Sequence, residues 1–416
     1  MSEIQRDLKH NWIANLLDGA FFGFALGFAS FITILPLFVS TMTESAILIG
    51  LVPTIHNVGW QLPQLFLANR VARQRQYRSM TIWMSIHERL PILGLAAVAW
   101  WGKAMGVQTA LLITFILLIW QGLGSGFTAN PWQSMIAKII PAEQRGTFLG
   151  AQSASANLLA SVGAVLAGMV LSSMTSPTDF AICFLAASFF MLISWFFLAW
   201  TREQDSPPPP AGPEQRGVRF WSGILQRDVN FRWFLVVRMV SQLSVMGFAF
   251  YTVYAVRQLG LNEIGVGLVT GIYTGVQIII NPIMGWMGDR WSRRNVLELG
   301  ILAAIGSALC AWWAPSANWF YLVFLLAGIA NVSIWTVSLA MVLEFGEENE
   351  RPAYIGLANT LVAPMTILTP FIGGWMADSF GYPAAFIASA LAGAGTELVI
   401  HLKVRDQGIH HNENND

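Results

Sequence analysis

The sequence is a succession of long apolar runs separated by short charged or Pro/Gly-rich breaks, and this pattern leaves few folds open. A helix that crosses a bilayer needs roughly 20 apolar residues. Twelve such runs fit the chain, six on each side of a polar stretch, and little length remains for a soluble catalytic domain. We therefore expect an all-α polytopic membrane protein. The expected spans are 12–39, 45–68, 79–101, 107–129, 147–172, 180–200, 232–256, 262–287, 296–314, 318–343, 353–376 and 382–402.

Composition excludes several other classes. The chain is 55% hydrophobic and 11% charged, whereas soluble chains carry about 25% charged residues. Lys+Arg and Asp+Glu are balanced at 23 each, so a nucleic-acid partner is not expected. Cys183 and Cys310 lie in separate apolar runs, which predicts neither a disulfide nor a metal site. We expect no cofactor, no ATP-binding loop and no cleaved signal peptide, because the first apolar run is too long for one.

The basic residues predict the orientation of the chain in the membrane. Lys and Arg are retained in cytoplasmic loops, and here they crowd into alternate connections. If the N-terminus is cytoplasmic, only Lys103 and Arg257 fall on the outer side. We therefore expect a multi-pass protein of a bacterial-type inner membrane with both termini in the cytoplasm.

The two halves of the chain carry matching features. The loop Asn69-Arg70-Val71-Ala72-Arg73 follows the second span, and Asp289-Arg290-Trp291-Ser292-Arg293 follows the eighth. Arg145 with Gly150 opens the fifth span as Arg351 with Gly356 opens the eleventh. Such parallel repeats occur in secondary transporters. The expected parts are a six-helix bundle at 1–200, a cytoplasmic linker at 201–231, a second six-helix bundle at 232–405 and a disordered cytoplasmic tail at 406–416.

The segment 285–294, Gly-Trp-Met-Gly-Asp-Arg-Trp-Ser-Arg-Arg, resembles the loop signature of the major facilitator superfamily (MFS). The resemblance extends over the whole chain through the twelve spans, the linker and the repeated loop. It implies the MFS fold of two pseudo-symmetric six-helix bundles. It further implies a rocker-switch transporter, with one central site between the halves that is exposed alternately to each side.

The same resemblance assigns gating roles. It implies that Asp289 caps the eleventh helix and that Arg293 pairs with Glu344 at the end of the tenth. The N-terminal half lacks both acids, because Asn69 replaces the first and Lys138 the second. We therefore expect an asymmetric cytoplasmic latch, with a role limited to topology as the alternative. The expected gating residues are Asp289, Arg290, Arg293, Glu344, Asn69, Arg70 and Arg73.

Ionisable residues inside spans are functional candidates because inserting them is costly. In the MFS architecture the first, fourth, seventh and tenth helices line the cavity, which favours Asp18 and Arg238. Arg238 suits an anionic substrate; the alternatives are an arginine that snorkels to the surface or pairs with Asp18. The expected substrate-binding residues are Arg238, Gln242, Asp18, Gln121, Asn331, Trp335, Gln277 and Tyr251.

The tripeptide His87-Glu88-Arg89 lies in the middle of the third span. Neighbouring residues on a helix diverge by about 100°, so we expect Glu88 and Arg89 to have partners on other helices, with His56 as one candidate for Glu88. A carboxylate paired with histidine can take up protons near neutral pH. Glu88, Arg89 and His56 are therefore the expected coupling residues, and a network that only fixes helix packing is the alternative.

Drug–proton antiporters of the superfamily carry an arginine three residues before a Gln-Gly pair, but Leu118 holds that position before Gln121-Gly122. A standard multidrug antiporter is therefore disfavoured. We expect a monomeric secondary active transporter, not an enzyme, whose partners are a small-molecule substrate, membrane lipid and protons. The alternatives are an efflux pump for amphipathic compounds and a sensor of the same fold that does not transport. The direction of transport is open.

Overall fold

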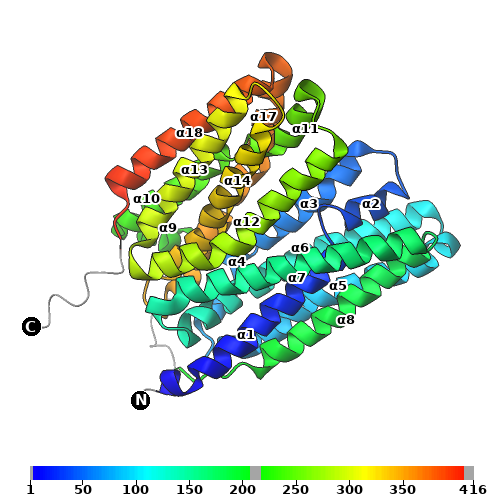
Figure 1. Cartoon of the computed structure of the whole chain (residues 1–416). Helices are drawn as coiled ribbons and strands as arrows, with labels where there is room; N and C mark the ends of the chain where they lie inside the picture. Colours follow the sequence, from blue (N-terminus) through cyan, green and yellow to red (C-terminus); the bar gives the residue numbers. More distant parts are fainter. Residues whose placement is uncertain (1–2, 207–216, 407–416) are drawn as a thin grey trace, which may run out of the picture. The chain divides into compact units, whose positions relative to one another are not determined.

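The computed structural model describes residues 3–206 and 217–406, and this part of the chain folds into helices joined by turns (Figure 1). The helices are α1 (Glu3–Phe28), α2 (Ile34–Ser40), α3 (Ala46–Gln61), α4 (Gln64–Ala72), α5 (Tyr77–Met105), α6 (Val107–Ile139), η1 (Ala142–Gln144), α7 (Arg145–Ser173), α8 (Thr178–Trp200), α9 (Val218–Arg227), α10 (Val229–Ser244), α11 (Phe248–Leu259), α12 (Glu263–Arg290), α13 (Arg293–Trp313), α14 (Trp319–Val332), η2 (Ser333–Val337), α15 (Ser338–Val342), α16 (Arg351–Thr360), α17 (Ala363–Phe380) and α18 (Tyr382–Lys403).

Several expected spans are broken rather than continuous. The first stops at Phe28 and resumes at Ile34, and the second is interrupted before Pro63. Proline lacks the N–H of a continuing helix, which accounts for the second break. The seventh and eleventh spans are broken as well, between α10 and α11 and between α16 and α17. The tenth contains a five-residue π-helix, η2, and such bulges are frequent at functional sites.

Nine segments of the described chain are long and apolar enough to cross a membrane. They correspond to the last nine of the twelve expected spans. The first three lie at α1–α2, α3–α4 and α5, and their status as spans stays a prediction. α5 is long enough at 29 residues, but His87, Glu88 and Arg89 make its centre polar.

The helices form two compact units. Unit 1 contains Met1–Pro141, Ser155–Glu214 and Gly346–Thr360, and unit 2 contains Ala142–Ala154, Gln215–Phe345 and Leu361–Asp416. Each unit therefore includes a short segment from the other half of the sequence: the start of α7 belongs to unit 2, and α16 belongs to unit 1. The bundle boundaries expected from the sequence stay a prediction.

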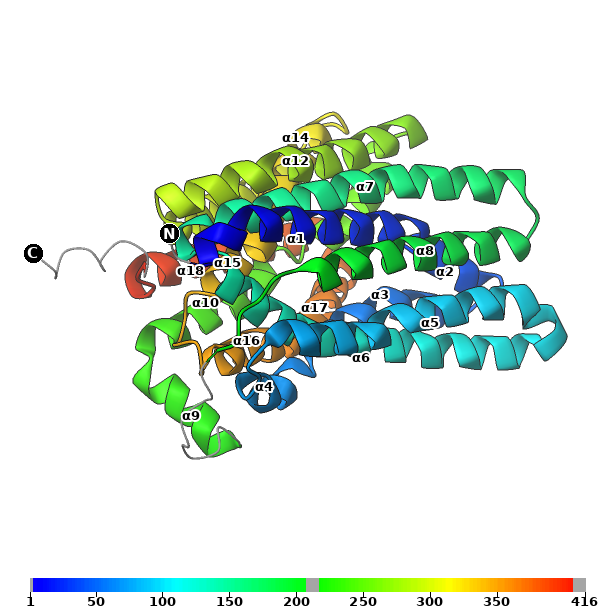
Figure 2. The same ribbon diagram turned by 90° about the horizontal axis from the view of Figure 1, so that it is seen from below.

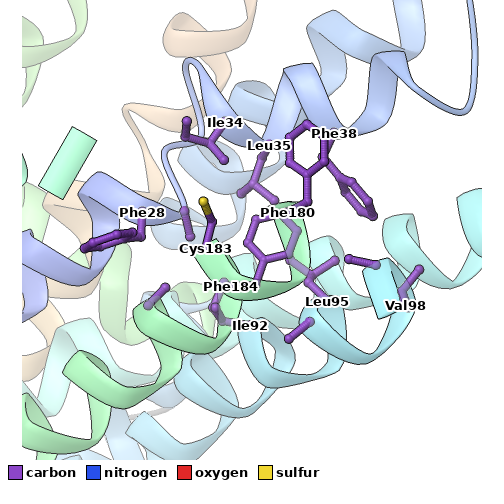
Figure 3. Close-up of a cluster of buried hydrophobic side chains, with 14 of the residues drawn as sticks. Phe28, Ile34, Leu35, Phe38, Ile92, Leu95, Val98, Phe180, Cys183 and Phe184 are labelled. Atoms are coloured by element: carbon purple, nitrogen blue, oxygen red, sulfur yellow. The ribbon is translucent and has the colours of Figure 1, made fainter. Parts of the chain in front are cut away.

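In unit 1, α1 packs along α8, and the long helices α5 and α6 lie side by side, as Figure 2 shows. The core of this unit is aromatic and aliphatic, with Phe28, Phe38, Phe180 and Phe184 at its centre (Figure 3). α1 approaches α7 closely through Gly23, because a Cβ there would lie 2.6 Å from the Cα of Ala156. Small residues of this kind let membrane helices pack backbone to backbone.

In unit 2, an aromatic core surrounds Tyr251, which packs against Phe320, Phe324 and Phe386. The expected linker at 201–231 also contains structure, since α9 lies within it and packs on α10. The centre of that linker, 207–216, and the expected tail beyond residue 406 lie outside the described residues.

Candidate functional site

A buried ion cluster joins three helices of unit 1. The guanidinium of Arg89 on α5 lies 3.6 Å from a carboxylate oxygen of Asp18 on α1 and 3.6 Å from one of Glu88. Ser194 on α8 donates a 2.6 Å hydrogen bond to Asp18 and accepts one of 3.0 Å from Arg89. Asp18 and Glu88 are 6% and 7% exposed, so these charges are largely removed from solvent.

The remaining donors of Arg89 are also engaged. Nε donates to the carbonyl of Met191 at 3.3 Å, and Nη1 donates to that of Ser85 at 3.4 Å. The guanidinium carbon lies 5.4 Å from the centre of the Phe22 ring, where a cation is favoured by the ring quadrupole. Glu88 and Arg89 thus contact each other despite being adjacent, because the long arginine side chain curls along the helix. Our expectation that each has a partner on another helix is met, by Asp18 on α1 for Arg89 and by Ser125 on α6 for Glu88.

This cluster contains two acids and one base. Glu88 also hydrogen-bonds Ser125 on α6, a neutral group that leaves the balance unchanged. If both carboxyl groups were ionised, the cluster would carry one uncompensated negative charge, which is costly to bury. The arrangement is therefore suited to holding one additional positive charge.

The structure places His56 away from the expected pairing with Glu88. Its Nδ1 lies 3.0 Å from Oε1 of Gln121 on α6, and its ring stacks on Phe31 at 3.9 Å between centroids. His87 accepts a 3.2 Å hydrogen bond from the indole of Trp120. The contact between His56 and Gln121 brings a residue expected in coupling together with one expected in substrate binding.

A groove of about 460 Å³ lies beside the cluster, between α5 and α8, and it is open at the surface, since Phe189 and Leu192 in its wall are 59% and 62% exposed. Its walls are mostly apolar, and Arg89 is its charged lining residue. The other lining residues are Ile86, Leu90, Leu93, Leu185, Ser188, Phe189, Leu192 and Trp195.

In unit 2, polar residues expected to bind substrate lie next to the π-helix. Asn331 donates a 3.0 Å hydrogen bond to Gln277, and Thr336 donates one of 2.6 Å to Asn281. Trp335, within the π-helix, is 39% exposed. This part of α12, α14 and η2 therefore combines carboxamides with an accessible indole ring.

Three other expected substrate residues lie in α10 and α11. Arg238 is buried, with 7% exposure, and Gln242 is half-buried one turn further along α10. Tyr251 is 1% exposed and its hydroxyl accepts a hydrogen bond from Ser307, so its position is that of a core residue.

The expected gating residues of unit 2 form a second buried cluster. Asp289 accepts hydrogen bonds from the backbone N–H groups of Gly146 and Thr147, at 2.8 and 2.6 Å. These N–H groups begin α7, so Asp289 caps the fifth expected span rather than the eleventh. Arg293 donates to Asp289 at 2.6 Å and forms an ion pair with Glu344. The expected Arg293–Glu344 contact is therefore present. The helix that Asp289 caps is α7, and not the eleventh expected span.

The other gating candidates are distributed around these loops. The guanidinium of Arg290 lies 5.0 Å from the ring of Trp286. Arg70 and Arg73 are exposed and Asn69 is half-buried. In the neighbouring turn, burial and the nearby Glu348 carboxylate raise the pKa of the Tyr77 phenol above its usual value, so Tyr77 stays neutral and donates a hydrogen bond to the Glu348 carbonyl.

Comparison with known proteins shows which proteins this chain resembles. The family model described as Major Facilitator Superfamily matches residues 234–414. The uncharacterized MFS-type transporter YfkF of Bacillus subtilis is 24% identical over 281 residues, 64% of this chain and 66% of that protein. The crystal structure of the Escherichia coli fucose:proton symporter FucP superposes with a TM-score of 0.76 at 14% identity, over 95% of this chain and 100% of FucP. Residues 234–414 thus carry the sequence pattern of the major facilitator superfamily.

One further relative aligns along almost the whole sequence. The multidrug resistance protein MdtG of Enterobacter lignolyticus is 24% identical over 417 residues, 97% of this chain and 93% of that protein. Alignments with three other curated relatives span 66%, 34% and 35% of those proteins' lengths. The chain thus spans two thirds or less of the length of these three relatives, and the FucP likeness supports the fold alone.

The structure contains a buried carboxamide network in unit 1, of which Gln64 and Asn130 were not singled out in the sequence. Asn359 on α16 donates a 2.7 Å hydrogen bond to Gln64 on α4, and Asn130 on α6 donates 2.8 Å to the carbonyl of Pro352. Gln64, Asn130 and Asn359 are all 0% exposed. Amides inside apolar runs are a visible signal, but a linear sequence does not show that these three meet. Glu203, in the linker, was also missed.

Proposed function

We propose that this protein is a secondary active transporter that moves a small solute by alternating access and couples the movement to protons. The match of residues 234–414 to the superfamily model supports the transport class. The coupling ion is proposed from a single observation, the buried cluster in which Asp18 and Glu88 share one guanidinium, that of Arg89.

The charge balance of this cluster favours a proton. A buried pair of carboxylates with one arginine is neutral overall when one carboxyl group is protonated. Binding and release of that proton would change the charge that Arg89 must balance and so change how tightly α1, α5 and α8 are held together. In this proposal Asp18 acts in coupling rather than in substrate binding, and His56 acts through Gln121.

The substrate side is proposed to lie in unit 2. Carboxamides at Gln277 and Asn331 offer both donors and acceptors, and Trp335 offers an apolar ring face, a combination typical of small-molecule sites. Arg238 and Gln242 on α10 would add recognition of an anionic or polar group.

Gating is proposed to involve the Asp289 cluster. Its members tie the first turn of α7 to α12, α13 and the turn that follows α15. Release of α7 from Asp289 would free this end of the helix during the transport cycle. Arg290, Asn69, Arg70 and Arg73 are proposed to assist in the same loops, with a cytoplasmic orientation that follows from the basic residues.

The first test is a ligand screen on purified protein. Ligands that bind the folded state raise its apparent thermal stability by mass action, so sugars, amino acids, carboxylates and lipophilic cations are compared. We expect one class to stabilise the wild type, and Arg238→Ala to remove the shift if that class is anionic. A shift unchanged by Arg238→Ala for carboxylates would exclude Arg238 from the site.

The second test measures coupling in proteoliposomes with the solute found by the screen. We expect an imposed pH gradient to drive accumulation in the wild type, and Glu88→Gln to lose the response to the gradient while keeping solute exchange. Glu397→Gln is the matched control, since it removes an acid from α18, outside the cluster. Gradient-driven accumulation by Glu88→Gln equal to that of the wild type would refute proton coupling through this cluster.

Efflux of amphipathic compounds is a second candidate. It is favoured by the apolar surface groove between α5 and α8 and by the alignment with MdtG over most of the chain. Stabilisation by lipophilic cations that Glu88→Gln abolishes would select this function. If a ligand stabilises the protein but is never carried across the vesicle membrane, a sensor of the same fold is indicated instead.

A further inference from the structure

The residues that directly follow α8 are held in place by specific contacts. The side chain of Glu203 has no exposed surface. Its carboxylate accepts hydrogen bonds from the backbone N–H groups of Tyr77 and Arg78, at 2.9 and 2.5 Å. Its third partner is the ammonium of Lys138 at the end of α6, 2.9 Å away. A carboxylate with three such donors is well compensated for its burial.

Glu203 supplies the hydrogen-bond acceptor that the N-terminus of α5 otherwise lacks. The residue before this helix, Gln76, makes no side-chain capping bond, so the first N–H groups of α5 require another acceptor. An anion at a helix N-terminus is also favoured by the helix dipole. Glu203 supplies both the acceptor and the negative charge, from a segment more than 100 residues away in sequence.

Unit 2 contains a similar arrangement, in which an acid caps a helix N-terminus and pairs with a base. There, Asp289 caps α7 and pairs with Arg293, which in turn binds Glu344. In the internal repeat, Lys138 stands where Glu344 stands. A base at that position needs an acid opposite it, and Glu203 is that acid. The N-terminal repeat therefore retains an ion pair at this point although both acids of the other repeat are missing.

The linker also contacts the segment that leads into α16. Ser206 donates a 2.6 Å hydrogen bond to the carboxylate of Glu348, and its N–H donates to the carbonyl of Arg75 at 3.0 Å. Tyr77, whose N–H is bound by Glu203, donates its phenol to the carbonyl of Glu348. Glu203 is thus connected with the residues just before α16 in two ways, along the backbone through Ser206 and by hydrogen bonds through Tyr77.

We propose that the Glu203–Lys138 pair is a latch that keeps α16 docked in unit 1, so that the linker between the halves takes part in gating. Breaking the pair frees the start of α5 and the linker, and with them Ser206 and Tyr77, which hold Glu348. α16 then separates more readily from α4 and α6. The inference rests on the proposed alternating access, in which α16 must undock, but its test needs neither substrate nor proton gradient.

The test reads the undocking of α16 directly. Ala353 in its first turn is 3% exposed, so Ala353→Cys reacts with a maleimide only when α16 opens; Cys183→Ala and Cys310→Ala remove the native thiols. We expect Glu203→Gln to raise the labelling rate about tenfold or more, because one partner of a buried ion pair is left alone. Arg202→Gln is the matched control, since the neighbouring Arg202–Asp7 pair is largely exposed at Arg202, and it should leave the rate unchanged.

A charge-preserving change provides the second arm. Lys138→Gln should accelerate labelling, whereas Lys138→Arg, which keeps a positive charge beside the Glu203 carboxylate, should label at close to the wild-type rate. Equal labelling rates in Glu203→Gln and Arg202→Gln would overturn the proposal. So would equal labelling rates in Lys138→Gln and Lys138→Arg. A wild-type protein that carries no solute across the vesicle membrane, while the labelling rates differ as expected, would instead count against the proposed function.

Discussion

At the scale of single residues, the ion cluster of unit 1 depends on how closely α5 and α6 approach each other. Gly124 on α6 faces the backbone of α5 at the same level as Glu88, and a Cβ on it would lie 2.6 Å from the Glu88 nitrogen. The missing side chain therefore lets Ser125, the next residue, reach Glu88. Gly124 has no functional group of its own, but by lacking a side chain it determines how closely Ser125 approaches the carboxyl group of Glu88.

We expect Gly124→Ala to destabilise the protein by about 1–3 kcal/mol, the usual cost of overpacking. The added methyl group would push α5 and α6 apart and lengthen the contact between Ser125 and Glu88. The measurement is the thermal unfolding midpoint in detergent. Gly168→Ala on α7 is the control, since a Cβ there meets nothing within 4 Å; an equal loss of stability in both variants would contradict the close approach.

Sequence alone predicts which of these residues are unusual but not which of them meet. Glu88 and Arg89 are conspicuous because charges inside a span are rare. The choice of His56 as a partner was wrong because the rotation of α3 about its own axis is set by packing, and packing turns His56 towards Gln121. Ser194 gave no signal, since serine is common in membrane helices, yet it bridges Asp18 and Arg89.

At the scale of elements, the positions of most helices follow from hydropathy, whereas their interruptions do not. A run of apolar residues has the same mean hydropathy whether the helix is straight or broken. The breaks at Pro63 and Gly247 carry a local proline or glycine, but the π-helix at Ser333–Val337 has no such marker. The cap of α7 by Asp289 was missed because a capping residue distant in sequence leaves no local pattern.

Asp289→Asn should destabilise the docking of α7 by on the order of 2 kcal/mol, because an amide accepts less strongly than a carboxylate from Gly146, Thr147 and Arg293. We expect a lower unfolding midpoint and altered transport. Asp378→Asn on α17 is a suitable control, since Asp378 is exposed. Unchanged stability and transport in Asp289→Asn would exclude this residue from the gate.

At the scale of the whole molecule, the distribution of Lys and Arg along the loops is the evidence for orientation. A membrane-impermeant maleimide should label Thr175→Cys, between α7 and α8, in intact cells. It should label Gln226→Cys, in α9, only after the membrane is opened, because the basic loops are expected in the cytoplasm. Both positions are exposed in the structure. The reverse pattern would invert the proposed topology.

The sharing of segments between the units has a consequence for biosynthesis. Unit 1 includes Gly346–Thr360, so a ribosome that has completed the first six spans has not yet made the helix that covers Gln64 and Asn130. These carboxamides stay without their α16 partners until most of the chain has emerged. The first half is thus unable to reach its final fold during synthesis, and a gene split between the halves would yield two fragments that each lack part of their own unit.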